Sequence, residues 1–261
     1  MARRNLKDAR IIVTGASSGI GRALAIQLCQ RGAHVLATAR RLDRLNELLE
    51  VCRDLSGKLT ILPGDLTSDA HRQAIFLQAT SQWNALDVLI NNAGAGAIGR
   101  FDVATSERLR RVMEIDFFAP VELTRTCLPL LERGRRPAIL NIGSVLSHRA
   151  VPNKSEYCAA KFAMRGWAES LRVELASKAI EVLMLSPSTT SSEFLDALVD
   201  TKASEKSKSL GSMLPERVAQ LAISALVRSK RELVLSLGGK SLVWAGRLFP
   251  RLTDRILGKF A

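Results

Sequence analysis

The chain has 261 residues, of which 47% are hydrophobic and 24% are charged. This size and composition suit one large α/β domain and exclude disorder as the expected state. The formal net charge of +13 favours anionic partners, such as a phosphorylated cofactor or an anionic membrane surface. We expect no nucleic-acid partner, because aromatic residues make up only 5% of the chain and no nucleic-acid-binding module is visible.

Cysteine and histidine usage sets the expected redox state and metal content. No pair of the four cysteines has a CxxC spacing, and three histidines are too few to complete a zinc site. We therefore expect reduced, mostly buried thiols in a cytoplasmic protein without a bound metal. The N-terminal apolar run is too short for a signal peptide, and no stretch of about twenty apolar residues predicts a membrane-spanning helix.

Predicted strands alternate with predicted helices along the chain. From the N-terminus the pattern gives strand 11–13, helix 20–31, strand 34–38, helix 42–55, strand 59–62, helix 69–82 and strand 87–91. It continues with helix 106–132, strand 138–142, helix 156–177, strand 180–185, a helix from 215 and strand 232–235. This alternation predicts parallel βαβ units, and hence a Rossmann-like doubly wound sheet in one catalytic domain over residues 1–235.

The segment 188–212 interrupts this alternation. It is rich in Ser, Thr and Lys and has few periodic apolar positions, so we expect a loop that shapes the substrate pocket, with a short helix near 193–199. Apolar side chains in and around this loop indicate either a hydrophobic substrate or simple packing. They are Leu146, Val151, Phe194, Leu195, Leu198 and Met213.

A glycine-rich loop joins the first strand to the first helix and has a GxxxGxG spacing. Glycines let the backbone approach a pyrophosphate, and the following helix N-terminus offers free N–H groups and a positive dipole end. A strand before the loop and a helix after it favour dinucleotide binding over an ordinary turn. The residues of the loop assigned to cofactor binding are Thr14, Gly15, Ser17, Ser18, Gly19, Ile20 and Gly21.

The end of the second strand indicates which dinucleotide binds. Arg40 lies 19 residues after Gly21 (40 − 21), near the position where an Asp or Glu would bind the ribose 2′-hydroxyl of NAD(H). The first acid here is Asp43, which already belongs to the next helix. Arg40 suits a 2′-phosphate instead, and Arg41 and Arg22 can assist it. We therefore predict NADP(H) as the cofactor; the alternative is a solvated arginine at a helix start.

Candidate catalytic residues follow the fifth strand and occupy the next helix. Ligands of open parallel sheets bind beyond the carboxyl ends of the strands, where Ser144 is expected. Tyr157 and Lys161 are spaced i, i+4, so they share a helix face. A nearby ammonium group stabilises a phenolate and lowers the tyrosine pKa, which suits Tyr157 to proton transfer beside a hydride-carrying cofactor. Taken alone, without the glycine loop, the pair is more typical of an amphipathic helix surface.

These features together resemble the short-chain dehydrogenase/reductase family, over about residues 8–235. The residues that carry the resemblance are Thr14-Gly15-xxx-Gly19-x-Gly21, Asp65, Asn91-Asn92-Ala93-Gly94, Ser144 and Tyr157-xxx-Lys161. Ser144 precedes Tyr157 by 13 residues, which is the spacing typical of the family. The resemblance implies a seven-stranded sheet, NADP(H) preference, and a homodimer or homotetramer assembled through the helices near 106–132 and 155–178.

The resemblance also implies a role for each matching residue. Tyr157 is the expected acid/base, Ser144 positions the carbonyl or hydroxyl group, and Lys161 binds the ribose and lowers the tyrosine pKa. The resemblance implies further cofactor contacts in addition to the glycine loop, Tyr157 and Lys161. They are Arg40, Asp65, Leu66, Asn91, Ala93, Gly94, Pro187, Thr189 and Thr190.

Two positions depart from the family pattern within the expected active site. Asp116 stands where the family carries a fourth catalytic residue, an Asn, and Ser188 replaces the glycine of a Pro-Gly turn. Asp116 keeps the backbone carbonyl through which that Asn acts, so we retain it as a catalytic-site residue. An ionised Asp116 near Lys161 would offset part of the lysine's effect on Tyr157.

A basic extension, residues 236–261, follows the catalytic domain. Between Val227 and Ala261 there are eight basic residues against Glu232 and Asp254, a balance of 8 − 2 = +6. An apolar stripe interrupted by Pro250 predicts two short amphipathic helices that suit an anionic membrane surface. The other interpretation, which we favour over membrane binding from the sequence alone, is that this stripe packs against the body, the substrate entrance or a second subunit.

The leading hypothesis is therefore an NADP(H)-dependent oxidoreductase that interconverts a carbonyl and a secondary alcohol, and so acts on CH–OH donors. Asp116 and Ser188 motivate a second hypothesis, an NADP(H)-binding regulatory or interaction protein with weak or no catalysis.

Overall fold

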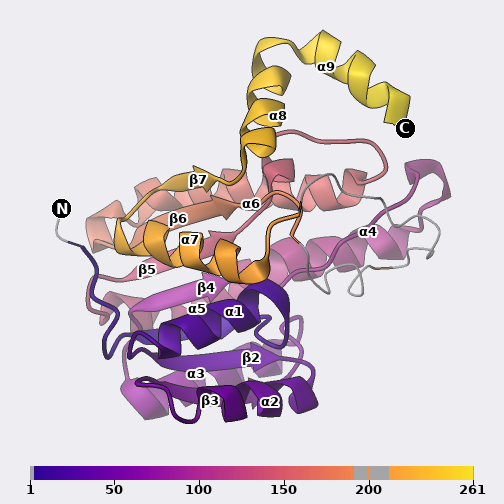
Figure 1. Cartoon of the computed structure of the whole chain (residues 1–261). Helices are drawn as coiled ribbons and strands as arrows, with labels where there is room; N and C mark the ends of the chain where they lie inside the picture. Colours follow the sequence, from indigo (N-terminus) through magenta and orange to yellow (C-terminus); the bar gives the residue numbers. More distant parts are fainter. Residues whose placement is uncertain (1–2, 191–198, 200–211, 261) are drawn as a thin grey trace.

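A seven-stranded parallel sheet forms the centre of the computed structural model, which describes residues 3–190, 199 and 212–260 (Figure 1). The strand order is β3-β2-β1-β4-β5-β6-β7, and every neighbouring pair is parallel. The strands are β1 (Arg10–Thr14), β2 (His34–Ala39), β3 (Lys58–Pro63), β4 (Val88–Asn91), β5 (Ala138–Ile142), β6 (Glu181–Ser186) and β7 (Glu232–Val234). This order confirms the predicted doubly wound Rossmann-like sheet.

Nine α-helices connect or follow these strands within the described residues. They are α1 (Gly19–Cys29), α2 (Leu42–Cys52), α3 (Asp69–Trp83), α4 (Ser106–Met113), α5 (Ala119–Glu132), α6 (Ser155–Glu174), α7 (Pro215–Val227), α8 (Leu237–Leu248) and α9 (Pro250–Leu257). The helix predicted near 193–199 and most of the predicted substrate loop lie outside the described residues.

The helix predicted over 106–132 is divided into three parts. α4 passes into a π-helix, Glu114–Phe118, which continues directly into α5. A π-helix widens the turn locally and is frequent at functional sites. Asp116 belongs to this widened turn and points inward, where the residue is 1% exposed. The pattern of apolar residues could not predict the interruption, because a single wide turn leaves the helical repeat almost unchanged.

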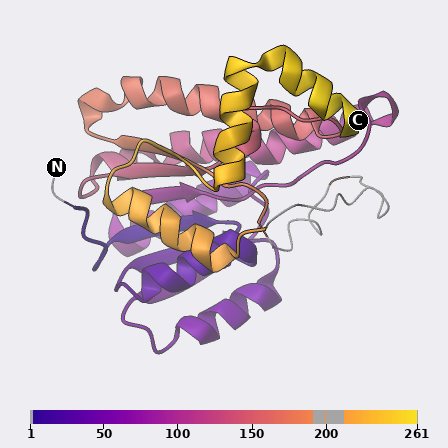
Figure 2. The same ribbon diagram turned by 45° about the horizontal axis from the view of Figure 1, so that its top comes forward.

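Apolar side chains of the strands alternate between two cores, one on each face of the sheet. In β1, Ile11 and Val13 join the core beneath α1, α2 and α7, whereas Ile12 joins the core beneath α3, α5 and α6. Figure 2 shows these two helix layers on opposite faces of the sheet. Burial on both faces explains why the central strands read as continuous apolar runs in the sequence.

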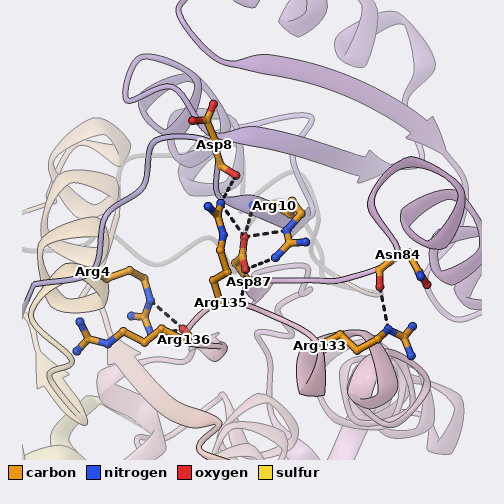
Figure 3. A network of polar contacts seen from close by, with 8 residues as sticks. All are labelled: Arg4, Asp8, Arg10, Asn84, Asp87, Arg133, Arg135 and Arg136. Atoms are coloured by element: carbon orange, nitrogen blue, oxygen red, sulfur yellow. Dashed lines mark hydrogen bonds and ion pairs between the residues drawn. The ribbon is translucent and has the colours of Figure 1, made fainter.

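A polar network ties the chain together near the beginnings of β1 and β4 (Figure 3). Asp87 accepts hydrogen bonds from the backbone nitrogen of Arg10 at 2.9 Å and from its Nη2 at 2.7 Å. It also accepts a hydrogen bond from the backbone of Arg135. Burial by itself would raise the pKa of Asp87, but these hydrogen bonds outweigh burial and lower it. This network lies at the amino ends of the strands, so it supports the fold and leaves the opposite sheet edge for ligands.

The four cysteines are all buried and none forms a disulfide bond. Within the described ranges, no helix is long and apolar enough to cross a bilayer.

Candidate active site

A cavity of about 650 Å³ opens at the carboxyl ends of the strands. Loops after six strands contribute to its lining, together with the start of α6 and the first turns of α8. This is the edge at which open parallel sheets bind ligands, because the loops that follow neighbouring strands meet there. The cavity is large enough for a dinucleotide cofactor and a small substrate.

The glycine loop between β1 and α1 forms one wall of this cavity. Gly15 has a φ of +67°, a left-handed conformation that residues with a Cβ atom rarely adopt. A Cβ atom on Gly21 would lie 2.3 Å from the carbonyl oxygen of Gly15 and 2.4 Å from Nδ2 of Asn92. Asn92 in turn donates from Nδ2 to the carbonyl oxygen of Thr14 at 2.8 Å. The tight turn therefore requires glycine at two positions and is held against the end of β4.

The N-terminus of α1 points at the cavity, and no side-chain cap accepts a hydrogen bond from its first backbone N–H groups. Ser18 is the N-cap residue and makes no capping hydrogen bond, and Gly19 and Ile20 line the cavity. Unpaired N–H groups at a helix N-terminus bind phosphate groups, and the helix dipole favours the same charge. A loop that brings backbone this close to an anion site fits the pyrophosphate of a dinucleotide.

Two arginines lie at the end of β2, on the rim of the cavity. Arg40 and Arg41 are exposed and line the cavity, and Nη2 of Arg41 donates to the hydroxyl of Ser17 at 3.3 Å. After the neighbouring strand β3, Oδ1 of Asp65 accepts hydrogen bonds from the backbone and hydroxyl of Thr67, both at 2.9 Å. Burial would raise the pKa of Asp65, but these hydrogen bonds lower it below its ordinary range. This wall thus combines a structured turn with a cationic rim.

Tyr157, Lys161 and Ser144 meet at the inner end of the cavity. Nζ of Lys161 lies 5.4 Å from the centroid of the Tyr157 ring, which follows from their i, i+4 spacing on α6. The hydroxyl of Ser144, which follows β5, lies near the tyrosine phenol and acts to lower its pKa. Ser144 is itself fixed, because the backbone nitrogen of Leu146 donates to its Oγ at 3.1 Å. The phenol therefore faces the cavity between a cation and a hydroxyl donor.

Asp116 lies directly behind Lys161. Its Oδ1 is 3.3 Å from Nζ of Lys161 and accepts a hydrogen bond from the backbone nitrogen of Ala95 at 3.0 Å. Its Oδ2 has no hydrogen-bond partner among the residues that the structure describes. Burial raises the pKa of Asp116. Burial by itself would lower the pKa of Lys161, but the Asp116 carboxylate outweighs burial, so the lysine pKa is raised. The two side chains form a buried ion pair.

A second buried ion pair fixes the start of α6. Nη2 of Arg108, on α4, donates to Oε1 of Glu156 at 2.7 Å, and both side chains are almost fully buried. Burial would raise the pKa of Glu156, but the hydrogen bonds from Arg108 lower it. Because Glu156 precedes Tyr157 directly, this pair limits rotation of the helix turn that presents the phenol. The sequence gives no signal for it, since the two residues are far apart in the chain.

Residues 9–203 match the profile of the family described as short chain dehydrogenase, which is more than half of the chain. The chain belongs to this family. It is therefore an oxidoreductase of the short-chain dehydrogenase type, with a cavity placed for a nicotinamide cofactor.

Individual relatives agree with this assignment. The chain is 32% identical over 264 residues to the uncharacterised oxidoreductase YxnA of Bacillus subtilis, covering 98% of this chain and 73% of the relative. Among solved structures, a short-chain dehydrogenase from Streptomyces avermitilis superposes with a TM-score of 0.82 at 27% identity, over 97% of both chains. A short-chain dehydrogenase/reductase from Burkholderia phymatum in complex with NAD has a TM-score of 0.84 at 20% identity, covering 98% and 96%, and shares the fold.

Most residues predicted for the site of this short-chain dehydrogenase line the cavity. The exceptions are Gly21, Asn91 and Asp116, which lie behind its wall, and Arg22, which is not part of the cavity lining. Gly21 allows the close approach of the glycine loop to Asn92, as described above. Asn91 is buried in the sheet, where its Nδ2 donates to Asn141 Oδ1 at 2.9 Å and to Thr124 Oγ1 at 3.0 Å. Asn91 thus joins β4 to β5 and α5, and reaches no ligand in the cavity directly.

The structure adds lining residues that the sequence patterns did not indicate. Gly238, Gly239 and Leu242 of α8 close one side of the dehydrogenase cavity, and Lys154 lies at its rim. A Cβ atom on Gly239 would lie 2.7 Å from Cγ2 of Val145, so α8 packs closely against the segment after β5. The Gly238-Gly239 pair after Ser236 is the one sequence signal that could have shown this close approach.

Proposed function

We propose that this short-chain dehydrogenase uses NADP(H) to interconvert a carbonyl and a secondary alcohol, with Tyr157 as the acid/base. The observation that carries the proposal is the placement of the Tyr157 phenol, which faces the cavity with Lys161 beside its ring and the Ser144 hydroxyl nearby. A phenol held between a cation and a hydroxyl donor is suited to proton exchange with a substrate oxygen.

The charge state of Tyr157 favours proton donation at neutral pH. Burial raises the pKa of the phenol above its ordinary value, Lys161 opposes this rise, and Asp116 adds to it. Tyr157 therefore holds its proton at neutral pH and can give it to a carbonyl oxygen. In the opposite direction the phenolate must form first, and Lys161 and Ser144 stabilise it. A bound nicotinamide cofactor supplies or accepts the hydride.

The preference for NADP(H) rests on the cationic rim after β2. Arg40 and Arg41 line the cavity, and the first acid after them, Asp43, lies within α2. An arginine pairs with a phosphate through charge-assisted hydrogen bonds, whereas a ribose 2′-hydroxyl is bound by a carboxylate. The donors at this rim therefore suit a 2′-phosphate.

The buried carboxylate of Asp116 favours a second candidate function, that of an NADP(H)-binding regulatory protein with weak catalysis. An acid that pairs with Lys161 reduces the cation's effect on the Tyr157 phenolate. Both functions share the same cofactor site, so turnover separates them.

Replacement of Tyr157 by Phe tests the proposed chemistry. We expect turnover of a carbonyl panel with NADPH to fall by about a hundredfold or more, because the proton donor is lost. NADPH binding, followed by thermal shift, should persist in this variant. Turnover equal to wild type in Tyr157→Phe excludes the mechanism, and tight NADPH binding without turnover in the wild type supports the regulatory function.

We further infer a homodimer or homotetramer assembled through α5 and α6. Large apolar side chains lie exposed on or beside these helices, namely Phe118, Phe162 and Val173. Exposed apolar patches of this kind mark contacts between subunits. Light scattering coupled to size exclusion tests the assembly, and a monomer at micromolar concentration contradicts it.

A further inference from the structure

The two C-terminal helices carry an outward face of large apolar side chains, which we name the tail face. Figures 1 and 2 both show α8 and α9 at the outer edge of the molecule, beyond β7. Each side chain of this face is at least half exposed, up to 83% for the first. The tail face consists of Leu237, Trp244, Leu248, Phe249, Leu252 and Ile256. Side chains of this size are usually exposed singly, so such a group points to an interaction surface.

The helical repeat shows that the tail face is separate from the surface by which α8 and α9 join the body. Trp244 and Leu248 are spaced i, i+4 on α8, as are Leu252 and Ile256 on α9, so each pair shares one side of its helix. On α8 the side that carries Gly239 and Val243 is buried, and on α9 Thr253, which is next to Leu252, is buried. The exposed apolar side chains are therefore additional to those that hold the helices in place.

Specific contacts fix these two helices to the catalytic domain. Arg149 packs against Gly246 of α8, where a Cβ atom would lie 2.6 Å from its Cδ, and its guanidinium forms an ion pair with Asp254 of α9. Ser236 caps α8 through a hydrogen bond from the backbone nitrogen of Gly239 at 2.9 Å. These contacts hold the tail face in one orientation relative to the cavity.

Positive charge surrounds the apolar side chains. Five basic residues and one acid occur between 237 and 260, and that acid, Asp254, is already paired with Arg149. Arg251 and Arg255 lie beside Leu252 and Ile256 on α9, one position back along the helix. Apolar side chains flanked by basic ones match an interface between acyl chains and anionic headgroups. A second copy of the same face would instead bring like charges together.

We infer that the tail face binds an anionic lipid bilayer, lying in the plane of the headgroups with its apolar side chains inserted. The contact is peripheral, because α8 and α9 have 12 and 8 residues and are too short to span a bilayer. Charge complementarity identifies the occupant as a lipid surface that carries net negative charge.

The position of α8 connects this surface to the cavity. Gly238, Gly239 and Leu242 of α8 line the cavity. Leu237 and Trp244 of the same helix belong to the tail face. A bilayer held against the tail face thus lies beside the cavity entrance. We therefore assign the substrate to apolar carbonyls or alcohols that partition into membranes, an assignment that rests on the proposed function.

Vesicle co-flotation of the full-length protein tests the membrane contact. The wild type should float with phosphatidylcholine vesicles that contain phosphatidylserine, far less with phosphatidylcholine alone, and less as salt rises. Leu248→Ser with Leu252→Ser, and separately Arg251→Glu with Arg255→Glu, should each lower the partition coefficient roughly tenfold or more. The fluorescence emission of Trp244 should shift to shorter wavelength when the wild type binds vesicles. The same shift is expected in the control variants described next.

Matched controls carry the same chemical changes elsewhere on the surface. Leu77→Ser with Val51→Ser removes exposed apolar side chains from α3 and α2, and Lys58→Glu with Lys7→Glu reverses exposed charges. Both controls should bind vesicles as the wild type does. Wild-type protein that fails to float at low salt overturns the inference. A second outcome also overturns it: the wild type is a dimer, and Leu248→Ser with Leu252→Ser makes it monomeric but leaves vesicle binding unchanged. The tail face is then a contact between two copies of the chain.

An activity measurement tests the substrate class separately. Anionic vesicles should lower the KM for a long-chain ketone severalfold in the wild type and leave it unchanged in the Leu248→Ser, Leu252→Ser variant. The kcat for a short water-soluble ketone should be equal in both proteins. If no ketone is reduced, the proposed function fails while the vesicle result stands. If vesicles do not change the KM for the long-chain ketone although the protein floats with them, the substrate assignment is wrong.

Discussion

Nζ of Lys161 lies 3.3 Å from Oδ1 of Asp116, and neither side chain is more than 7% exposed. The cation that should lower the pKa of Tyr157 is thus paired with an anion that raises it. The carboxylate acts from behind the lysine, so it changes the electrostatics of the phenol without touching the cavity.

Replacement of Asp116 by Asn should shift alcohol oxidation to lower pH. Removal of the carboxylate lowers the pKa of Tyr157, so more phenolate is present at any pH below that pKa. The oxidation rate there follows the phenolate fraction, about tenfold for each pH unit by which the profile moves. A pH–rate profile of kcat/KM measures the shift. Asp102→Asn, which removes an exposed carboxylate, serves as the control and should leave the pH–rate profile unchanged. A profile of Asp116→Asn that moves to higher pH contradicts this account.

Replacement of Arg40 and Arg41 by Ser should weaken NADPH binding by roughly ten- to a hundredfold and leave NADH binding little changed. The expected loss follows from hydrogen bonds between a guanidinium and a charged group, worth about 1.5–3 kcal/mol. Calorimetric titration with each cofactor measures the ratio. Arg44→Ser, in the first turn of α2 and outside the cavity lining, should retain both affinities. Equal losses of affinity for NADPH and NADH would show that the two arginines do not bind the 2′-phosphate.

A methyl group at Gly21 should abolish cofactor binding. Its Cβ atom would lie 2.3 Å from backbone of the glycine loop, so the loop must move away from its cofactor-binding shape. Gly166→Ala in α6 is the matched control, because a Cβ atom there meets nothing within 4 Å. This control should be neutral or more stable by up to about 1 kcal/mol, as alanine replaces glycine in a helix. Thermal shift with and without NADPH measures both effects; a normal NADPH shift in Gly21→Ala would refute the assigned role.

Asp87→Asn should destabilise the fold at neutral pH by about 2–3 kcal/mol, less than for a fully buried pair because Arg10 is partly exposed. The pKa of Asp87 is lowered by its hydrogen bonds, so its stabilising contribution is complete above the unfolded-state pKa near 3.9. That contribution is lost as the pH falls toward the lowered folded-state pKa. Urea unfolding across pH should therefore show the gap between wild type and variant narrowing in acid. A constant gap would mean that the carboxylate's charge contributes nothing.

The sequence alone determined the sheet, the cofactor loop and the pairing of Tyr157 with Lys161. These features depend on local regularities: alternating strand and helix patterns, glycines at fixed spacings, and an i, i+4 relation that places two side chains on one helix face. The parallel strands also bring their carboxyl ends to one edge, so residues such as Ser144 could be assigned to the site from their position after a strand.

Only the tertiary structure decided how charges and distant segments act on that site. Asp116 forms an ion pair with Lys161 because a π-helix turns it inward, and Glu156 pairs with Arg108 across two helices. The amphipathic pattern predicted α8 and α9, but it could not show which side packs on Val145 and Arg149 and which stays exposed. Contacts between residues far apart in the chain depend on how whole elements pack, and no short-range pattern records that packing.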